Sequence, residues 1–225
     1  MNKNLLVWIL IGCSGSLLYA QDTSITSKYL EDQIYAGVAY NFLDKRPTGV
    51  ILRNLSYNLK FGVIKDIPFN AQRNFGIGFG VGYSTNSYYS NIVATETTDG
   101  INYELLEAGD LKRSKFETHG VEFPFEIRWR TSNAEDYKFW RLYSGLSFEY
   151  LFSQRSKVVS DTVNSSFTNQ DINNWQYGIT LNFGYNTFNI HLYYSLTPLL
   201  NDSARLNEDS IQVRPIRIGV IFYIL

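Results

Sequence analysis

The sequence predicts an all-β protein, an eight-stranded antiparallel up-and-down transmembrane β-barrel. Eight segments alternate large apolar and small or polar residues with a period of two, the period of a β-strand. Beyond the N-terminus, no segment approaches the roughly 18 consecutive apolar residues of a transmembrane helix, although 16% of the chain is aromatic. Short turns alternate with long polar loops, which is typical of outer-membrane barrels whose termini lie on the short-turn side.

The N-terminal residues have the pattern of a secretory signal. Lys3 supplies positive charge, residues 5–11 form an apolar segment, and Leu18-Tyr19-Ala20 resembles a cleavage site. The predicted divisions are a signal peptide at 1–20, a short periplasmic segment at 21–32 and the barrel at 33–225. In an alternative interpretation, Leu10-Ile11-Gly12-Cys13 is a lipobox, and Cys13 is acylated. Cleavage after Ala20 would remove the single cysteine, so no disulfide or thiolate metal site is expected.

The predicted strands follow one another without a repeat or an interdomain linker, which indicates one domain. They span residues 34–42, 55–63, 75–83, 120–130, 140–152, 175–184, 188–196 and 216–224. Links after the second, fourth and sixth strands are the shorter ones, whereas those after the third and fifth are long and polar. Strands of about 9–11 residues match a tilted membrane crossing.

The apolar face of each strand is predicted to contact lipid. It carries about five large side chains per strand, and eight such strands would overfill the interior of a soluble, lipocalin-like barrel. The opposite face is rich in Gly, Ser, Asn and Thr, which suits a narrow lumen. The net charge of −1 provides no field to attract nucleic acid.

One predicted strand, "NFGIGFGVGYS", has a glycine at every second position. The spacing excludes a G-x-G-x-x-G phosphate loop, because Val81 and Tyr83 stand where that motif needs glycine. We interpret the glycines as a bare wall of the lumen that leaves room for long side chains on the neighbouring strands. This glycine wall comprises Gly76, Gly78, Gly80 and Gly82.

Charged side chains on the lumen parity predict a structural ion-pair network. Its members are Lys60, Glu122, Glu126, Arg128, Arg141 and Glu149. A proton or ion path is the functional alternative, but an eight-stranded barrel leaves no open channel. A hydrolase-like dyad of Glu122 and Glu126 is disfavoured, since four residues on one strand span roughly 13 Å. His119 and His191 fall at opposite heights, so neither a shared metal site nor a catalytic triad is expected.

The segment "RWRTSNAEDYKFWRLY", residues 128–143, crowds aromatic and basic residues around one short turn. We interpret its aromatic residues as part of an interfacial girdle, with a periplasmic docking surface for a partner protein as the alternative. These residues are Trp129, Tyr137, Phe139 and Trp140.

Three stretches resemble the PorT family of small, porin-like outer-membrane barrels. They are "KDIPFN", the glycine strand leading into "YSTNSYYSNIVATET", and "VEFPFEIRWRTSNAEDYKFWRLYSG". The resemblance implies an outer-membrane accessory or assembly component of type IX protein secretion, whose partners are the lipid bilayer and other outer-membrane or periplasmic secretion components. It implies no catalytic residue and no cofactor. The alternatives are a surface binding or adhesion module that acts through the long loops, and a small-solute pore.

Overall fold

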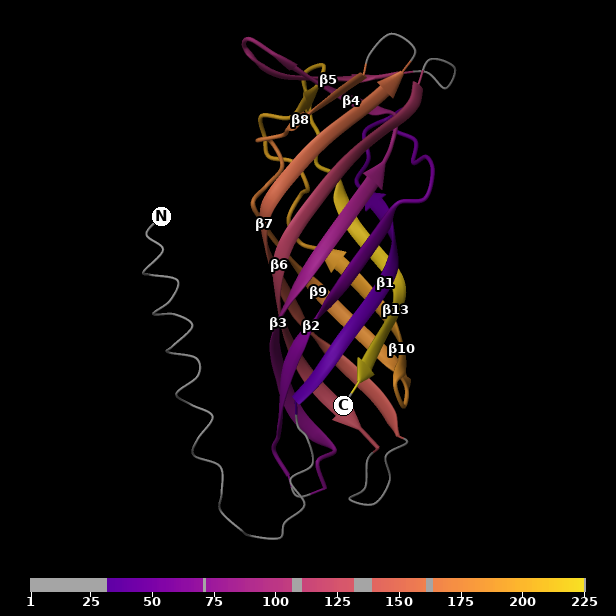
Figure 1. Ribbon diagram of the computed structural model, residues 1–225, viewed down its shortest axis with the longest axis vertical. Helices are drawn as coiled ribbons and strands as arrows, with labels where there is room; N and C mark the ends of the chain where they lie inside the picture. Colours follow the sequence, from indigo (N-terminus) through magenta and orange to yellow (C-terminus); the bar gives the residue numbers. More distant parts are fainter. Residues whose placement is uncertain (1–31, 71, 107–110, 132–138, 161–163, 225) are drawn as a thin grey trace, which may run out of the picture.

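The computed structural model describes residues 32–70, 72–106, 111–131, 139–160 and 164–224, so the predicted signal peptide and Cys13 lie outside the described residues. Every regular element among them is a β-strand, and eight strands close into an antiparallel barrel (Figure 1). The barrel strands are β1 (Asp32–Asp44), β2 (Tyr57–Pro68), β3 (Phe75–Tyr89), β6 (Leu111–Arg130), β7 (Trp140–Ser160), β9 (Trp175–Tyr185), β10 (Phe188–Ser195) and β13 (Arg214–Ile224). The predicted fold class is confirmed.

The barrel closes between its first and last strands, because Ile34 of β1 pairs with Ile224 of β13. The first strand therefore begins, and the last one ends, at the same end of the barrel. That end also carries the two-residue turn between β9 and β10, in which Asn186 has a φ of 55°. Such a left-handed residue suits the tight turns of β-hairpins. Termini and short turns mark the periplasmic end of an outer-membrane barrel, so the long connections lie at the extracellular end.

Several strands are longer than the sequence predicts. β2 continues to Pro68 because Lys65–Pro68 pair with Gly76–Phe79 of β3. β6 and β7 have 20 and 21 residues and stay paired up to Leu111 and Ser160. Much of the sequence predicted as polar loop after the third and fifth strands is therefore strand, since mutual pairing satisfies its backbone groups above the membrane.

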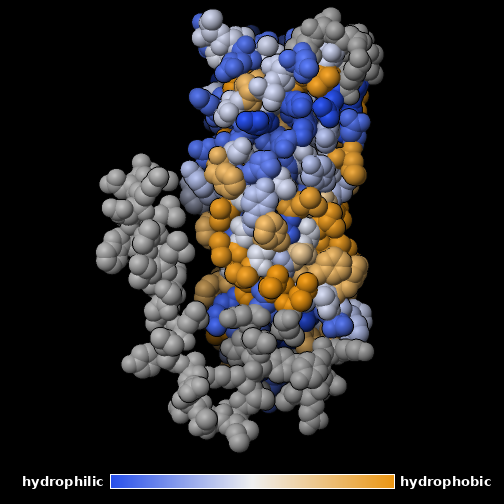
Figure 2. Space-filling model, viewed as in Figure 1, coloured by the Kyte–Doolittle hydropathy of each residue, from blue (hydrophilic) through white to orange (hydrophobic). Residues whose placement is uncertain are grey.

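The side chains alternate in and out along the barrel as predicted. Phe61 and Trp175 point outward and are 59% and 57% exposed, whereas Asn58 and Arg128 point inward and are fully buried. An apolar belt surrounds the middle and lower part of the visible face, and a hydrophilic surface lies above it (Figure 2). None of the described residues forms a helix long and apolar enough to cross a membrane.

The remaining strands lie at the extracellular end. A four-stranded sheet has the order β12 (Asp209–Ser210), β11 (Arg205–Leu206), β5 (Gly100–Leu105) and β4 (Ile92–Thr97). β8 (Asn164–Thr168) pairs with the upper part of β7 (Figure 1). We call the four-stranded sheet, β8 and the connections at 45–56, 169–174 and 196–213 the cap.

Candidate functional site: a filled lumen and a folded cap

Arg128 forms the centre of a polar cluster near the periplasmic end of the lumen. Its guanidinium binds Glu126, with Nη2 and Nε lying 2.8 and 2.9 Å from Oε2, and it donates to Gln33 Oε1 at 3.2 Å. Nη1 lies 3.4 Å from Oδ1 of Asp66, which also pairs with Arg130. The fully buried cation of Arg128 is thus compensated by the carboxylates of Glu126 and Asp66, as a charge in a dry interior requires.

Two further ion pairs occupy the lumen above this cluster. Lys60 Nζ lies 3.9 Å from Glu122 Oε2, and the Tyr35 hydroxyl donates to Glu122 Oε1 at 2.6 Å. Arg217 Nη2 lies 3.0 Å from Glu149 Oε2. Because Glu122 and Glu149 are directly opposite each other on β6 and β7, each of them needs its own cation. The charged lumen residues thus form separate groups rather than one continuous network.

Two of the predicted residues have other surroundings than the sequence suggests. Arg141 forms no ion pair with a carboxylate of the described residues; its guanidinium lies over the rings of Phe139 and Tyr223, at 4.7 and 5.8 Å. It stands opposite Arg130, which already binds the nearby Asp66.

Phe139 is only 5% exposed, so its assignment to the outward girdle is wrong. It shares the inward parity of Arg141 and fills the periplasmic end of the lumen.

The glycine wall faces the lumen, and two of its members make room for named side chains. A Cβ at Gly78 would lie 2.5 Å from Arg128 Nε, and a Cβ at Gly82 would lie 2.0 Å from the Tyr35 hydroxyl oxygen. At Gly76 and Gly80 a Cβ would instead approach backbone oxygens of β2, at 2.5 and 2.3 Å. Half of the wall thus accommodates lumen side chains, and the other half allows close strand approach.

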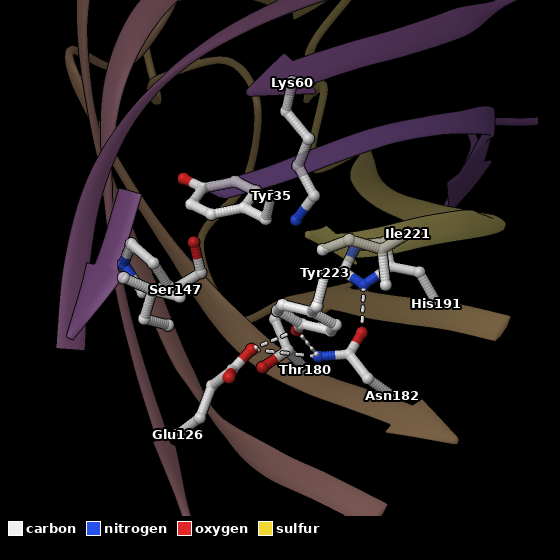
Figure 3. Close-up of a pocket in the computed structure, with 11 residues that line it drawn as sticks. Tyr35, Lys60, Glu126, Ser147, Thr180, Asn182, His191, Ile221 and Tyr223 are labelled. Carbon is white, nitrogen blue, oxygen red and sulfur yellow. Dashed lines mark hydrogen bonds between the residues drawn. The ribbon is translucent and has the colours of Figure 1, made fainter. Parts of the chain in front are cut away.

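The only histidine in the lumen, among the residues the structure describes, belongs to a hydrogen-bonded group. His191 Nδ1 lies 2.6 Å from Asn182 Oδ1, and Asn182 and Tyr223 both donate to Glu126, at 3.0 and 2.7 Å (Figure 3). Lys60 points into the same cavity, which has room for about one water molecule. The described residues contain no group of three or more His, Cys, Asp or Glu suited to a metal ion.

The aromatic residues at the periplasmic end divide between the two faces. Trp129 and Trp140 point outward and are 46% and 48% exposed, and the Trp140 ring stacks on Phe183 with 5.3 Å between centroids. Tyr137 lies outside the described residues.

The second histidine, His119, lies nearer the extracellular end of β6 and faces outward. Its Nδ1 lies 2.6 Å from the Tyr83 hydroxyl oxygen.

The cap has an apolar core of its own. It combines inward side chains from the upper ends of β1, β3, β6 and β7 with residues of β4, β5 and the connections. The fully buried members, each at most 1% exposed, are Tyr88, Ile92, Ala94, Phe116, Ile172, Leu199, Leu200, Ala204, Ile211 and Val213. This core fills the extracellular end of the lumen, so the long connections close the barrel instead of standing free.

A buried polar group joins the hairpin of β4 and β5 to the connection between β8 and β9. The Tyr103 hydroxyl donates to Asp171 Oδ2 at 2.9 Å and lies 3.0 Å from the donor Nδ2 of Asn169. Burial, and secondarily the negative charge of Asp171, raise the pKa of Tyr103, which keeps its phenol protonated. Leu206 of β11 pairs with Tyr103 as well, which joins the β10–β13 connection to the hairpin. The cap is therefore a folded unit.

Sequence reasoning missed parts of both regions. Asp66 carries two of the lumen ion pairs, but the prediction placed it in a turn. The parity of Lys60 continues through Ile64 to Asp66, and this signal would have identified it. In the cap, Leu199 and Leu200 are a pair of apolar residues in a predicted connection, and their hydrophobicity indicated burial.

A closed eight-stranded barrel with an apolar belt, a polar filled lumen and a folded cap defines an integral β-barrel protein of the outer membrane. The chain belongs to the outer membrane protein beta-barrel domain family, which it matches over residues 19–201. It therefore resides in the outer membrane in contact with the lipid bilayer. No curated protein matches the chain.

Two crystal structures of Ail, the attachment invasion locus protein of Yersinia pestis, are similar to this chain. One is of Ail itself and the other of its complex with the heparin analogue sucrose octasulfate. In each comparison the identity is 17%, the TM-score is 0.37, and the match covers 85% of this chain and 97% of Ail.

Proposed function

We propose that this protein is a non-enzymatic surface binding module, in which the barrel is the anchor and the cap is the recognition surface. The observation that carries the proposal is the apolar core of the cap, which orders the connections before any partner arrives. A pre-ordered surface loses less conformational entropy on binding than flexible loops would. A filled lumen disfavours the alternative of a solute pore.

The exposed tip of the cap hairpin is the part of this surface best placed to meet a partner. Glu96, Asp99 and Glu104 are all exposed, and the tip turns at Gly100, whose φ is 136°. The nearby connection between β10 and β13 adds Glu208 and Asp209, which are exposed too. A partner of basic surface chemistry fits this acidic edge.

Exchange of the hairpin tip tests this function. Replacing residues 96–100 with a neutral Gly-Ser turn leaves the buried Ile92, Ala94 and Tyr103 in place, so the cap core keeps its apolar contacts. We expect cells displaying the variant to lose attachment to basic surfaces, such as polylysine-coated plates. A matched exchange of Arg46-Pro47-Thr48 on the β1–β2 connection, where Arg46 and Thr48 are exposed, should leave attachment intact. Unchanged attachment of the tip variant would exclude the cap hairpin as the binding element.

The second candidate is an accessory role in type IX protein secretion. It is favoured by the resemblance of the β6–β7 hairpin to the PorT family, and by the exposed rings of Trp129 and Trp140 beside its turn. The two functions separate in one strain set. In a strain that lacks the gene, the variant with residues 96–100 exchanged at the tip of the cap hairpin should restore secretion, if the periplasmic β6–β7 hairpin is the active part. A Trp129→Ala/Trp140→Ala variant that is inserted in the membrane should then fail to restore it.

A further inference from the structure

The outward face of β6 and β7 changes its chemistry just above the apolar belt. The last apolar residues are aromatic: the Tyr83 ring lies 6.4 Å from Phe152 and 6.1 Å from His119. Beyond them the outward side chains on these two strands are mainly cationic. We call Arg113, Lys115, Arg155 and Lys157 the basic strip; with Glu117 among them, its net charge is +3 (four cations and one carboxylate).

Among the described residues, one carboxylate, Glu117, neutralises part of the basic strip. Glu117 forms an ion pair with Lys115, whose ammonium also lies 5.8 Å from the centre of the Tyr89 ring. Within the described part of the chain, Arg113, Arg155 and Lys157 form no ion pair. Lys115 and Lys157 are, moreover, direct cross-strand neighbours. Like charges placed opposite each other destabilise a sheet, so the arrangement calls for an anion from outside.

The height of the strip identifies that anion. Arg155 follows Phe152 by three residues, which is about 10 Å along a strand and about 7 Å along the membrane normal at a tilt of 45°. The headgroup layer extends roughly 5–7 Å beyond the hydrocarbon on each side. Arg155 therefore lies at headgroup level. Lys157 stands higher, but its flexible stem allows the ammonium to reach down to the same layer.

The extracellular rim is not uniformly basic. The connection between β10 and β13, which emerges elsewhere on the rim, exposes Asp202, Glu208 and Asp209 against the single cation Arg205. A headgroup with negative charge is thus attracted to the β6–β7 side rather than to the β10–β13 side of the rim. From these observations we propose that the basic strip binds the phosphate groups of an anionic outer-leaflet lipid, with Arg155 and Lys157 as the main ligands.

Lipid titration in neutral detergent micelles tests the proposal, with diphosphoryl lipid A as the anionic probe and phosphatidylcholine as the zwitterionic one. Native mass spectrometry should show saturable retention of lipid A and little retention of phosphatidylcholine. Arg155→Gln/Lys157→Gln should weaken lipid A binding roughly tenfold or more. Lys45→Gln/Arg46→Gln removes the same charge from exposed positions of the β1–β2 connection and should leave binding unchanged.

Two measurements keep the test independent of any folding defect. Lipid A binding to the unaltered protein should fall steeply as the salt concentration approaches about 1 M, where charges are screened beyond roughly 3 Å. Lys157→Gln should raise the urea midpoint in lipid-free micelles, because it removes the repulsion from Lys115, yet reduce the further stabilisation by lipid A. Equal retention of the two lipids, a salt-independent affinity, or equal losses in the two double variants would overturn the proposal.

Discussion

Gly78→Ala should destabilise the barrel through Arg128. The added Cβ would lie 2.5 Å from Arg128 Nε, whereas ordinary contact begins at 3.4 Å, so the guanidinium must move by about 0.9 Å (3.4 − 2.5). A shift of that size can lengthen the 2.9 Å bond to Glu126 to as much as 3.8 Å, which is beyond hydrogen-bonding range.

The expected magnitude lies between two limits. Overpacking a core costs about 1–3 kcal/mol, and breaking a buried ion pair costs about 3–5 kcal/mol. Alanine recovers about 0.5–1 kcal/mol relative to glycine, because the unfolded chain loses freedom. We therefore expect a net loss of about 2 kcal/mol in the free energy of unfolding.

A double-mutant cycle isolates the cause. In an Arg128→Met background the obstacle is gone, so Gly78→Ala should become neutral or slightly stabilising, with a coupling energy of about 2 kcal/mol. Urea unfolding in lipid vesicles, followed by tryptophan fluorescence, measures all four proteins. Gly37→Ala is the matched control, since its nearest side-chain contact would be Lys60 Cγ at 3.2 Å. If Gly78→Ala were equally harmful with methionine at 128, the volume argument for the glycine wall would be refuted.

Three further outcomes follow from the cap, the rim and the lumen. Tyr103→Phe should cost about 1–2 kcal/mol in cap stability, since it leaves buried partners unsatisfied; hydrogen exchange should rise in β4 and β5 alone, and faster exchange throughout the barrel would contradict this. Burial tends to raise the pKa of Glu117, but the hydrogen bond and charge of Lys115 outweigh it and hold the pKa below the ordinary 4.5. The stability that this carboxylate contributes is therefore present at neutral pH and disappears as the pH falls below that value, so the urea midpoints of the wild type and Glu117→Gln should converge in acid and not in alkali. In planar bilayers the protein should show no conductance steps, because Arg128, Tyr143 and Tyr223 obstruct the lumen; steady ion currents would show that the lumen opens.

The period of two was sufficient to predict which side of each barrel strand faces the lumen and which side faces lipid. It placed Glu122 and Glu126 inside and Phe123 and Phe125 outside, because one face meets hydrocarbon and any slip of register would expose charges there. Residue type was a poorer guide than this period. Phe139 follows its strand parity into the lumen, although its residue type suggested the girdle.

The cap could not be predicted in the same way, because its core is assembled from distant segments. Ile92, Leu200 and Val213 belong to three different parts of the chain, and none of these parts has a long periodic pattern. Isolated apolar residues between polar ones resemble solvated loops until tertiary contacts bury them. The periodicity of a single sequence relates residues at a fixed spacing along one strand. It carries no information on which distant loops pack together.

The polarity of the barrel reverses along β6 and β7, and this reversal links the fold to the proposed functions. On β6 the outward parity is unbroken, yet it changes from Val121 and Phe123 to Glu117 and Lys115, while Phe116 is buried inside. On β7 an irregularity in the pairing, opposite His119 and Gly120, transfers the outward position from the even-numbered Phe152 to the odd-numbered Arg155. Below this level, apolar side chains face outward to lipid and polar side chains fill the lumen. Above it, the same two strands carry polar side chains outward to water and enclose an apolar core. Because both regions share continuous strands, the cap is held rigidly relative to the membrane surface, and a partner bound to the cap meets it at a fixed height and orientation.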